Sequence, residues 1–242
     1  MKNPHRPALL LALLLAATLP VQAQTAVPAA PKVPAKPASA PELALKIEHD
    51  ITTLSADGIT RNVRYAERLV RQGDQVWLAR VLPPNAHEEA EHAAGAKSHK
   101  HMDVAAAARW VQRAPDGTLR VRLVNAHDKL AVDVPQADWA NAGFDGQWAS
   151  ALHLLDPARV ARMTPLARPA PTGSKWVESR NGQMTVRVLW DDKGQYPRRV
   201  ESSHARGTSR SVTVATPEAL PKPLPWDRLQ GYAQKEYSDL LD

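Results

Sequence analysis

The chain has 242 residues, 43% of them hydrophobic, no cysteine and a formal net charge of +6. Without cysteine there are no disulfides, thiolate metal ligands, cysteine nucleophiles or c-type haem attachment, so any metal must be held by nitrogen and oxygen ligands. Four basic residues precede residue 42, and the remainder carries 27 basic against 25 acidic residues. That balance is not typical of a nucleic-acid-binding protein, so we expect no nucleic-acid partner.

The first 23 residues have the organisation of a secretory signal peptide. Lys2 and Arg6 precede an apolar run over 8–19, and residues 21–23 end in the small side chain that signal peptidase requires. The apolar run is too short to span a bilayer, and no later segment is apolar enough to do so. We therefore predict a cleaved signal peptide over 1–23 and a periplasmic protein without a transmembrane segment.

Residues 24–41 contain five prolines separated mainly by alanine and lysine. Such a segment cannot bury enough apolar area to order itself, and proline favours extended conformations. We predict a disordered linker over 24–41, followed by a single domain over 42–242.

The predicted domain is mainly β, of the α+β type. Turn signals such as Asp116-Gly117 and Asn181-Gly182 separate runs in which apolar and polar residues alternate. Alternation of this kind is typical of antiparallel strands with one buried face and one wet face. The predicted hairpins are 61–71/75–82, 108–114/118–125, 183–190/196–203 and 196–204/208–214.

A histidine-rich loop is expected over 84–107. Four of the nine histidines lie between residues 87 and 101, among several carboxylates. If 86–94 is helical and 99–101 is extended, one face of each piece could contribute to a solvent-exposed zinc or copper site, because imidazole and carboxylate suit these ions. The candidate ligands are Glu88, His92, His99 and His101. The alternative is a surface insertion with only incidental metal affinity. The spacing is not the HExxH motif of zinc proteases.

Trp139 and Trp148 flank the segment NAGFDG at 141–146, where a loop meets a predicted helix. Together with Phe144 they are candidate ligand-binding residues at the mouth of a pocket. The simpler alternative is that the tryptophans are core anchors that fix this loop, because tryptophan buries a large area.

Helical signals are few. Asp156-Pro157 is a cap followed by a first-turn proline, and it predicts a helix over 158–163. Trp148, Ala151, Leu152 and Leu155 have helical spacing just before it. A further apolar stripe predicts a C-terminal helix packed on the sheet; it consists of Leu229, Tyr232, Ala233, Tyr237, Leu240 and Leu241.

No complete catalytic motif accompanies these elements. The chain has no GxSxG elbow, P-loop, GxGxxG or HExxH sequence. Ser202 and His204 share a strand face, but no elbow or oxyanion turn accompanies them. We therefore expect a protein that is not an enzyme.

The hairpin at 196–214 resembles the outer-membrane lipoprotein carrier and receptor superfamily. The residues that carry the resemblance form an aromatic–proline pair, a basic–apolar–acidic run and a turn glycine: Tyr196, Pro197, Arg199, Val200, Glu201 and Gly207. The strand ending at Trp190 and the hairpin at 61–83 are similar to that family as well. The resemblance implies a curved antiparallel sheet or half-open β-barrel, with a few helices on its concave face. It also implies a non-catalytic role in holding acyl chains or docking envelope proteins. The histidine-rich loop and the C-terminal helix depart from the family pattern.

Three functional hypotheses follow. The leading one is a non-enzymatic periplasmic binding or carrier protein with an apolar cavity for a lipid-like or protein ligand. The first alternative is a periplasmic zinc- or copper-binding protein that uses 87–103. The second alternative is a regulatory or assembly partner of an envelope protein. The sequence specifies neither the ligand nor the oligomeric state. It makes no cofactor certain, and zinc or copper is the candidate.

Overall fold

The computed structural model describes residues 40–82 and 106–240. The predicted signal peptide, nearly all of the predicted linker and the segment 83–105 with its histidines lie outside these residues. The described residues belong to one compact unit, Ala38–Asp242.

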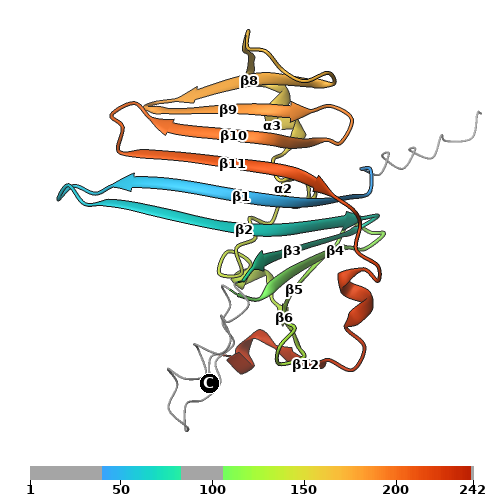
Figure 1. The fold of residues 1–242 in the computed structure, drawn as a ribbon. Coiled ribbons are helices and arrows are strands. Elements are labelled where there is room, and N and C mark those ends of the chain that lie inside the picture. The colour runs from blue at the N-terminus through green and yellow to red at the C-terminus, as the bar shows by residue number, and fades with distance from the viewer. Residues whose placement is uncertain (1–39, 83–105, 241–242) are drawn as a thin grey trace, which may run out of the picture. The chain divides into compact units, whose positions relative to one another are not determined.

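A single curved sheet of twelve strands dominates the described part of the chain (Figure 1). The sheet is unclosed, and its strand order is β12-β6-β5-β4-β3-β2-β1-β11-β10-β9-β8-β7. All neighbouring strands are antiparallel except β12 and β6, which are parallel. The bounds are β1 Leu43–Leu54, β2 Thr60–Gln72, β3 Gln75–Val81, β4 Ala108–Arg113, β5 Leu119–Asn125, β6 Leu130–Val134, β7 Thr164–Pro165, β8 Ser174–Asn181, β9 Met184–Asp191, β10 Tyr196–His204, β11 Ser209–Glu218 and β12 Ala233–Glu236.

The prediction of a mainly β antiparallel fold is confirmed, and each of the four predicted hairpins is present. Strand β1, which the sequence pattern did not predict, joins the two halves of the sheet. Ile47 of β1 lies opposite Glu67 of β2 on one side and opposite Ala215 of β11 on the other. The β1–β11 pairing brings together segments that are more than 150 residues apart in the chain, and it makes one sheet out of two groups of hairpins.

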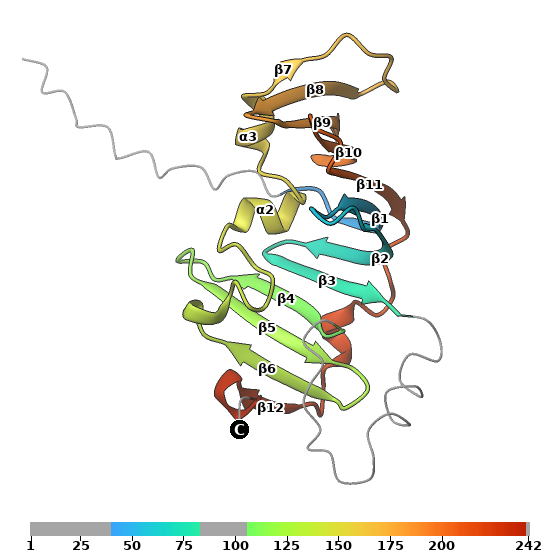
Figure 2. The same cartoon turned by 90° about the vertical axis from the view of Figure 1, so that its left-hand side faces the viewer.

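Different segments pack on the two faces of the sheet (Figure 2). We call the face that carries Leu45 and Ile47 the helix face, because α2 (Trp148–His153) and α3 (Pro157–Ala161) lie against it. The opposite face carries Trp77 and Trp110, and the segment 220–232 packs over them. This segment includes the 3-10 helix η2 (Pro225–Arg228), and a further 3-10 helix, η1, spans Gln136–Asp138. Alternation along each strand therefore supplies apolar side chains to two separate cores.

Both predicted internal helices are present. The Asp156 side chain accepts a hydrogen bond of 2.9 Å from the backbone N–H of Ala158, and Pro157 occupies the first turn of α3. This is the cap that the sequence predicts, and it satisfies one of the free N–H groups at the helix start.

The predicted C-terminal helix is wrong as a continuous element. The stripe from Leu229 is divided between a turn, the parallel strand β12 and a 3-10 helix, η3 (Tyr237–Leu240). The backbone N–H of Ala233 donates to the carbonyl of Lys129 at 2.9 Å, which starts the pairing with β6. The free edge of β6 offers hydrogen bonds to the chain, and Tyr237 still buries its ring in the core beneath this edge. Tertiary pairing has overridden the local helical spacing.

One buried arginine ties these elements together. The guanidinium of Arg71, on β2, is 1% exposed. It donates to the carbonyl oxygens of Pro41 (3.0 Å), Leu152 (2.6 Å), Gln195 (3.3 Å) and Gly194. It thus joins the start of β1, the end of α2 and the β9–β10 turn. Burial lowers the pKa of Arg71 to about 10, which leaves the side chain charged at neutral pH.

His153 lies beside this arginine at the end of α2. Its Nδ1 is 2.8 Å from the carbonyl oxygen of Gln195, so the Nδ1–H donates to that carbonyl. Burial lowers the pKa of His153, and the nearby Arg71 charge acts in the same direction. The neutral imidazole is therefore the form that the fold accommodates.

We predict that Arg71→Lys lowers the free energy of unfolding by roughly 3 kcal/mol, because an ammonium cannot reach carbonyls in several directions and leaves some of them unsatisfied. Arg64→Lys is the matched control on the same strand, since the Arg64 side chain is 80% exposed and its replacement should change stability by less than about 0.5 kcal/mol. Urea unfolding of both variants measures the difference. Equal stability of the two variants would contradict a structural role for Arg71.

We also predict that acid destabilises the protein through His153. Because its pKa in the folded state is below the ordinary value, the unfolded state takes up a proton first, and stability falls as the pH drops below about 6.5. In His153→Asn, whose amide N–H can still donate to Gln195, the loss between about pH 7.5 and about pH 5.5 should be smaller. Thermal unfolding at both pH values tests this. The same pH slope in both proteins would rule out His153 as the responsible group.

Candidate functional site

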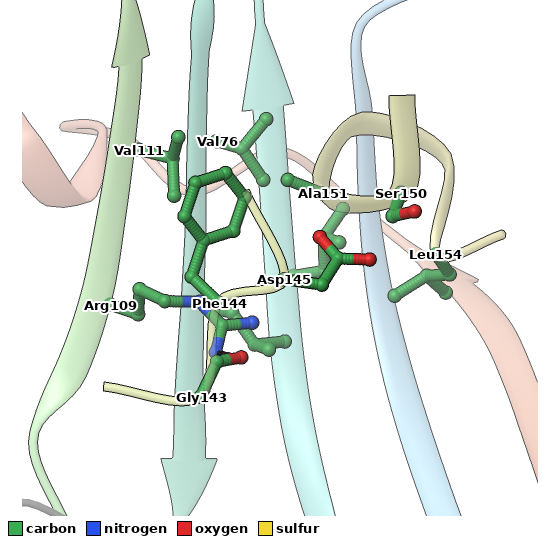
Figure 3. A pocket seen from close by; sticks show the side chains of 11 residues that line it. Val76, Arg109, Val111, Gly143, Phe144, Asp145, Ser150, Ala151 and Leu154 are labelled. Atoms are coloured by element: carbon green, nitrogen blue, oxygen red, sulfur yellow. Dashed lines mark hydrogen bonds between the residues drawn. The ribbon is translucent and has the colours of Figure 1, made fainter. Parts of the chain in front are cut away.

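A cavity of about 230 Å³ lies between the helix face and the segment 139–154, which we call the roof (Figure 3). The sheet contributes the apolar side chains of Leu69, Val76, Leu78 and Val111 to its floor. The strand register explains this floor, because Leu69 lies opposite Leu78 and Val76 opposite Val111, all on one face. The roof contributes Phe144, Ala151 and Leu154. The result is a mainly apolar cavity on the helix face.

Arg109, Asp145 and Ser150 supply the polar part of the lining. Arg109 follows Ala108 on β4 and lies on the helix face opposite Leu78, so that its guanidinium reaches under the roof. It donates to the carbonyl oxygens of Ala142 (3.2 Å) and Gly143. Burial lowers the pKa of Arg109, while the carboxylates of Glu67 and Asp145 favour its charged form. Within the described chain no carboxylate is close enough to form an ion pair with it.

A second cavity of about 360 Å³ shares Leu78, Arg109 and Gly143 with the first. Its lining is mixed: it adds polar groups of Glu67, Arg80 and Asn141 and the apolar side chains of Ala107, Leu123 and Ala142. We call it the polar cavity because it holds more charged groups than the first. A mainly apolar compartment and a compartment of mixed polarity thus have the guanidinium of Arg109 in common.

The local conformation of the roof depends on two contacts. The backbone N–H of Phe144 donates to the carbonyl of Trp139 at 2.8 Å, which closes the loop and turns the Phe144 ring toward the sheet. Gly143 has a φ of +70°, and a Cβ there would lie 2.9 Å from Nη1 of Arg109. Glycine is required at this position because it permits both the backbone conformation and the approach of Arg109.

Of the three predicted ligand-binding residues, one lines a cavity and two pack beside it. Phe144 lines the apolar cavity and is 3% exposed. Trp139 packs on Phe144 with a ring-centroid distance of 5.2 Å and donates from Nε1 to the carbonyl of Val134 at 3.1 Å. Trp148 packs between two core clusters, with the Arg113 guanidinium 4.8 Å from its ring. Neither tryptophan lines the two cavities, and their role in ligand binding stays a prediction.

Local sequence patterns did not indicate the floor residues or Arg109. The two-residue period of a strand places Arg109 on the same face as the buried Val111, which is the signal that the sequence offered. A charged residue beside a buried apolar one on a strand face indicates either a salt bridge or a site.

The candidate metal ligands Glu88, His92, His99 and His101 lie outside the described residues. In residues 40–82 and 106–240, no group of three or more histidine, aspartate or glutamate side chains is placed to hold a metal ion. The described residues therefore give no support to the metal-binding alternative.

A series of polar side chains leads away from Glu67, which lines the polar cavity. Nε2 of His49 is 3.0 Å from Oε2 of Glu67, and Nδ1 is 3.1 Å from Oγ1 of Thr213. The imidazole also stacks on Tyr65 at 4.4 Å. These contacts have the order of a hydroxyl–histidine–carboxylate triad, but Thr213 pairs with strands on both sides. The backbone around Thr213 therefore offers no free pair of N–H groups for an oxyanion. We interpret the contacts among Thr213, His49 and Glu67 as a structural link between β11, β1 and β2.

Within the residues that the structure describes, no helix is long and apolar enough to span a membrane.

No protein-family model matches the chain, and no curated protein matches it significantly. The chain is similar to a conserved protein from Thermus thermophilus, with 9% identity over 79% of this chain and 90% of that one and a TM-score of 0.36. It is similar to a putative outer membrane lipoprotein-sorting protein domain from Vibrio parahaemolyticus (9% identity, 77% and 89% covered, TM-score 0.32). It is also similar to a LolA superfamily protein from Nitrosomonas europaea (10% identity, 75% and 89% covered, TM-score 0.28). Similarity at this level identifies neither a ligand nor an activity.

We predict that Phe144→Ala lowers the free energy of unfolding by about 3–5 kcal/mol, because the ring joins roof and floor and its loss enlarges the cavity. Ile59→Ala is the control at an exposed position, where the expected change is below about 0.5 kcal/mol. Denaturant unfolding measures both. A loss of less than about 1 kcal/mol for Phe144→Ala would show that the roof does not depend on this ring.

Proposed function

We propose that this protein is a non-enzymatic periplasmic binding or carrier protein, whose ligand is an amphiphile with an apolar chain. The observation that carries the proposal is the pair of cavities that meet at Arg109. The apolar one suits a hydrocarbon chain, and the polar one suits a head group. Ligand sites are commonly concave, mainly apolar and provided with few polar groups, as this one is.

The charge of Arg109 favours a head group that carries a carboxylate or a phosphate. Its guanidinium has hydrogen bonds to two carbonyls but no ion pair in the described chain, and it lies at the boundary between the two cavities. A guanidinium has five N–H donors, so it can bind an anion and keep its carbonyl contacts. Glu67, which also lines the polar cavity, would discriminate against a head group with a second negative charge.

The proposed location rests on the predicted signal peptide over 1–23 and on the absence of cysteine. Among the described residues that line the two cavities, the polar side chains provide cations and carboxylates but no nucleophile accompanied by a base and an oxyanion site. A binding role therefore accounts for the site better than a catalytic one.

We predict that Ala151→Leu weakens binding of a fluorescent long-chain fatty acid at least about tenfold, because the added side chain fills the apolar cavity. Ala158→Leu is the matched control: Ala158 is exposed on α3, outside the cavity. The titration uses the chain from residue 24 onward, which contains the whole compact unit Ala38–Asp242. Fluorescence titration compares the three proteins.

Arg109→Gln tests the head group. It should weaken binding of the fatty acid several-fold more than binding of the alcohol of the same chain length, because only the acid carries a charge. Equal affinity of the wild type and Ala151→Leu, or no binding of either amphiphile, would refute the proposed function.

A further inference from the structure

The hairpin between β1 and β2 presents apolar side chains to solvent. Large hydrophobic side chains are exposed at four positions in the described chain, and three of them are on this hairpin: Leu54 (42% exposed), Ile59 (63%) and Val63 (38%). Figure 1 shows that the tip of this hairpin reaches farther than the β8–β9 and β10–β11 turns at the same end of the sheet. The exposed apolar residues are therefore collected at a projecting tip.

The tip of this hairpin is an ordered, hydrogen-bonded turn. The backbone N–H of Ser55 donates to the carbonyl of Ile59 at 3.0 Å, and that of Gly58 donates to the carbonyl of Ser55 at 3.1 Å. The N–H of Leu54 donates to Thr208 of the adjacent hairpin at 2.8 Å. Gly58 has a φ of +82°, which glycine adopts without strain. These hydrogen bonds fix the backbone at Leu54 and Ile59. The two side chains remain exposed to solvent in the described fold.

Three arginines lie near these two residues in the strand register and in the adjacent turn. Arg61 is opposite Thr53 and Arg210 is opposite Thr52, so these two arginines lie on opposite faces of the sheet, one or two residues from Leu54. Arg206 lies in the β10–β11 turn. All three arginines are exposed, and no carboxylate of the described chain pairs with them. Farther along β2 the arginines are paired: Arg64 with Asp50 at 3.0 Å and Arg68 with Glu218 at 3.1 Å.

The tip also carries one carboxylate, Asp57, which accepts a hydrogen bond from the Ser55 hydroxyl. The three unpaired guanidinium groups outnumber it, so the end of the hairpin has an excess of positive charge. Exposed apolar side chains close to exposed cations complement an anionic bilayer, because the bilayer interface takes up apolar side chains and lipid phosphates attract cations.

We propose that the β1–β2 hairpin docks the protein on the surface of an anionic lipid bilayer. Leu54 and Ile59 enter the interface, while Arg61, Arg206 and Arg210 contact lipid phosphates. A bilayer suits this surface better than a protein partner, because the apolar area is small and projecting, whereas a stable protein interface buries about 1,000 Å² or more of complementary surface. The proposal does not depend on the function assigned to the cavities.

Vesicle flotation with the chain from residue 24 onward tests this surface. The wild type should bind vesicles of phosphatidylglycerol and phosphatidylethanolamine more tightly than vesicles of phosphatidylcholine, and about 0.5 M NaCl should weaken the binding. Leu54→Ser with Ile59→Ser should reduce binding to the anionic vesicles at least about tenfold. Arg61→Gln with Arg210→Gln should reduce it about tenfold and weaken its salt dependence.

Val81→Ser is the matched control, because Val81 is 38% exposed on β3, away from the hairpin, and it should bind like the wild type. Ala151→Leu should also bind vesicles normally, which separates this test from that of the cavity. No binding of the wild type, or equal binding by the Leu54→Ser/Ile59→Ser variant, overturns the proposal. A change of oligomeric state in that variant, measured by sedimentation velocity, would assign the tip to contact between copies and overturn it as well.

Discussion

The burial of one positive charge organises the centre of this fold. Arg71 places its guanidinium among backbone carbonyls of the β1 entry, the end of α2 and the β9–β10 turn, three segments that share no strand pairing with one another at that point. The last carbonyls of a helix have no partner within the helix, and a buried cation needs hydrogen-bond acceptors. The Arg71 guanidinium and the carbonyl at the end of α2 therefore satisfy each other. Leu154, directly after α2, has a φ of +65°, and the helix ends there next to the carbonyl of Leu152 that Arg71 binds.

That arrangement also positions the candidate site. Because α2 is held at its C-terminal end by Arg71, the roof is attached to β2 there, and Arg109 attaches it to β4 at Gly143. The cavity lies between these two attachments, over the apolar floor of β2, β3 and β4. Arg71 and Arg109, which both lie on the largely apolar helix face, thus fix the two ends of the roof. The space between them is the one that we propose for the apolar chain of the ligand. Arg71 is fully enclosed by carbonyls, and Arg109 has donors available to an anion.

Apolar side chains occur in two settings in the described structure, enclosed between segments of the chain and exposed at the tip of a hairpin. Beneath the roof and beneath segment 220–232, apolar side chains are enclosed by the chain itself. At the β1–β2 tip, Leu54 and Ile59 are held in solvent by a hydrogen-bonded turn. An enclosed surface suits a ligand that is taken up, whereas a projecting one among unpaired arginines suits a surface on which the protein rests. A carrier that exchanges a lipid-like ligand with a membrane would use both.

Local signals in the sequence were sufficient for the hairpins and for the capped helix at Pro157, because a turn, a cap and an alternating face depend on neighbours in the chain. They were also sufficient for the fold class, and they made Phe144 a candidate whose role in ligand binding stays a prediction. They could not determine the role of β1, whose pairing with β11 joins residues such as Ile47 and Ala215 across most of the chain. Only the tertiary structure decided that the stripe after Leu229 becomes strand β12, since the free edge of β6 is not visible in the local pattern. It alone decided which arginine is enclosed and which borders a cavity, because the register of distant strands, and not residue type, sets whether a guanidinium meets carbonyls or open space.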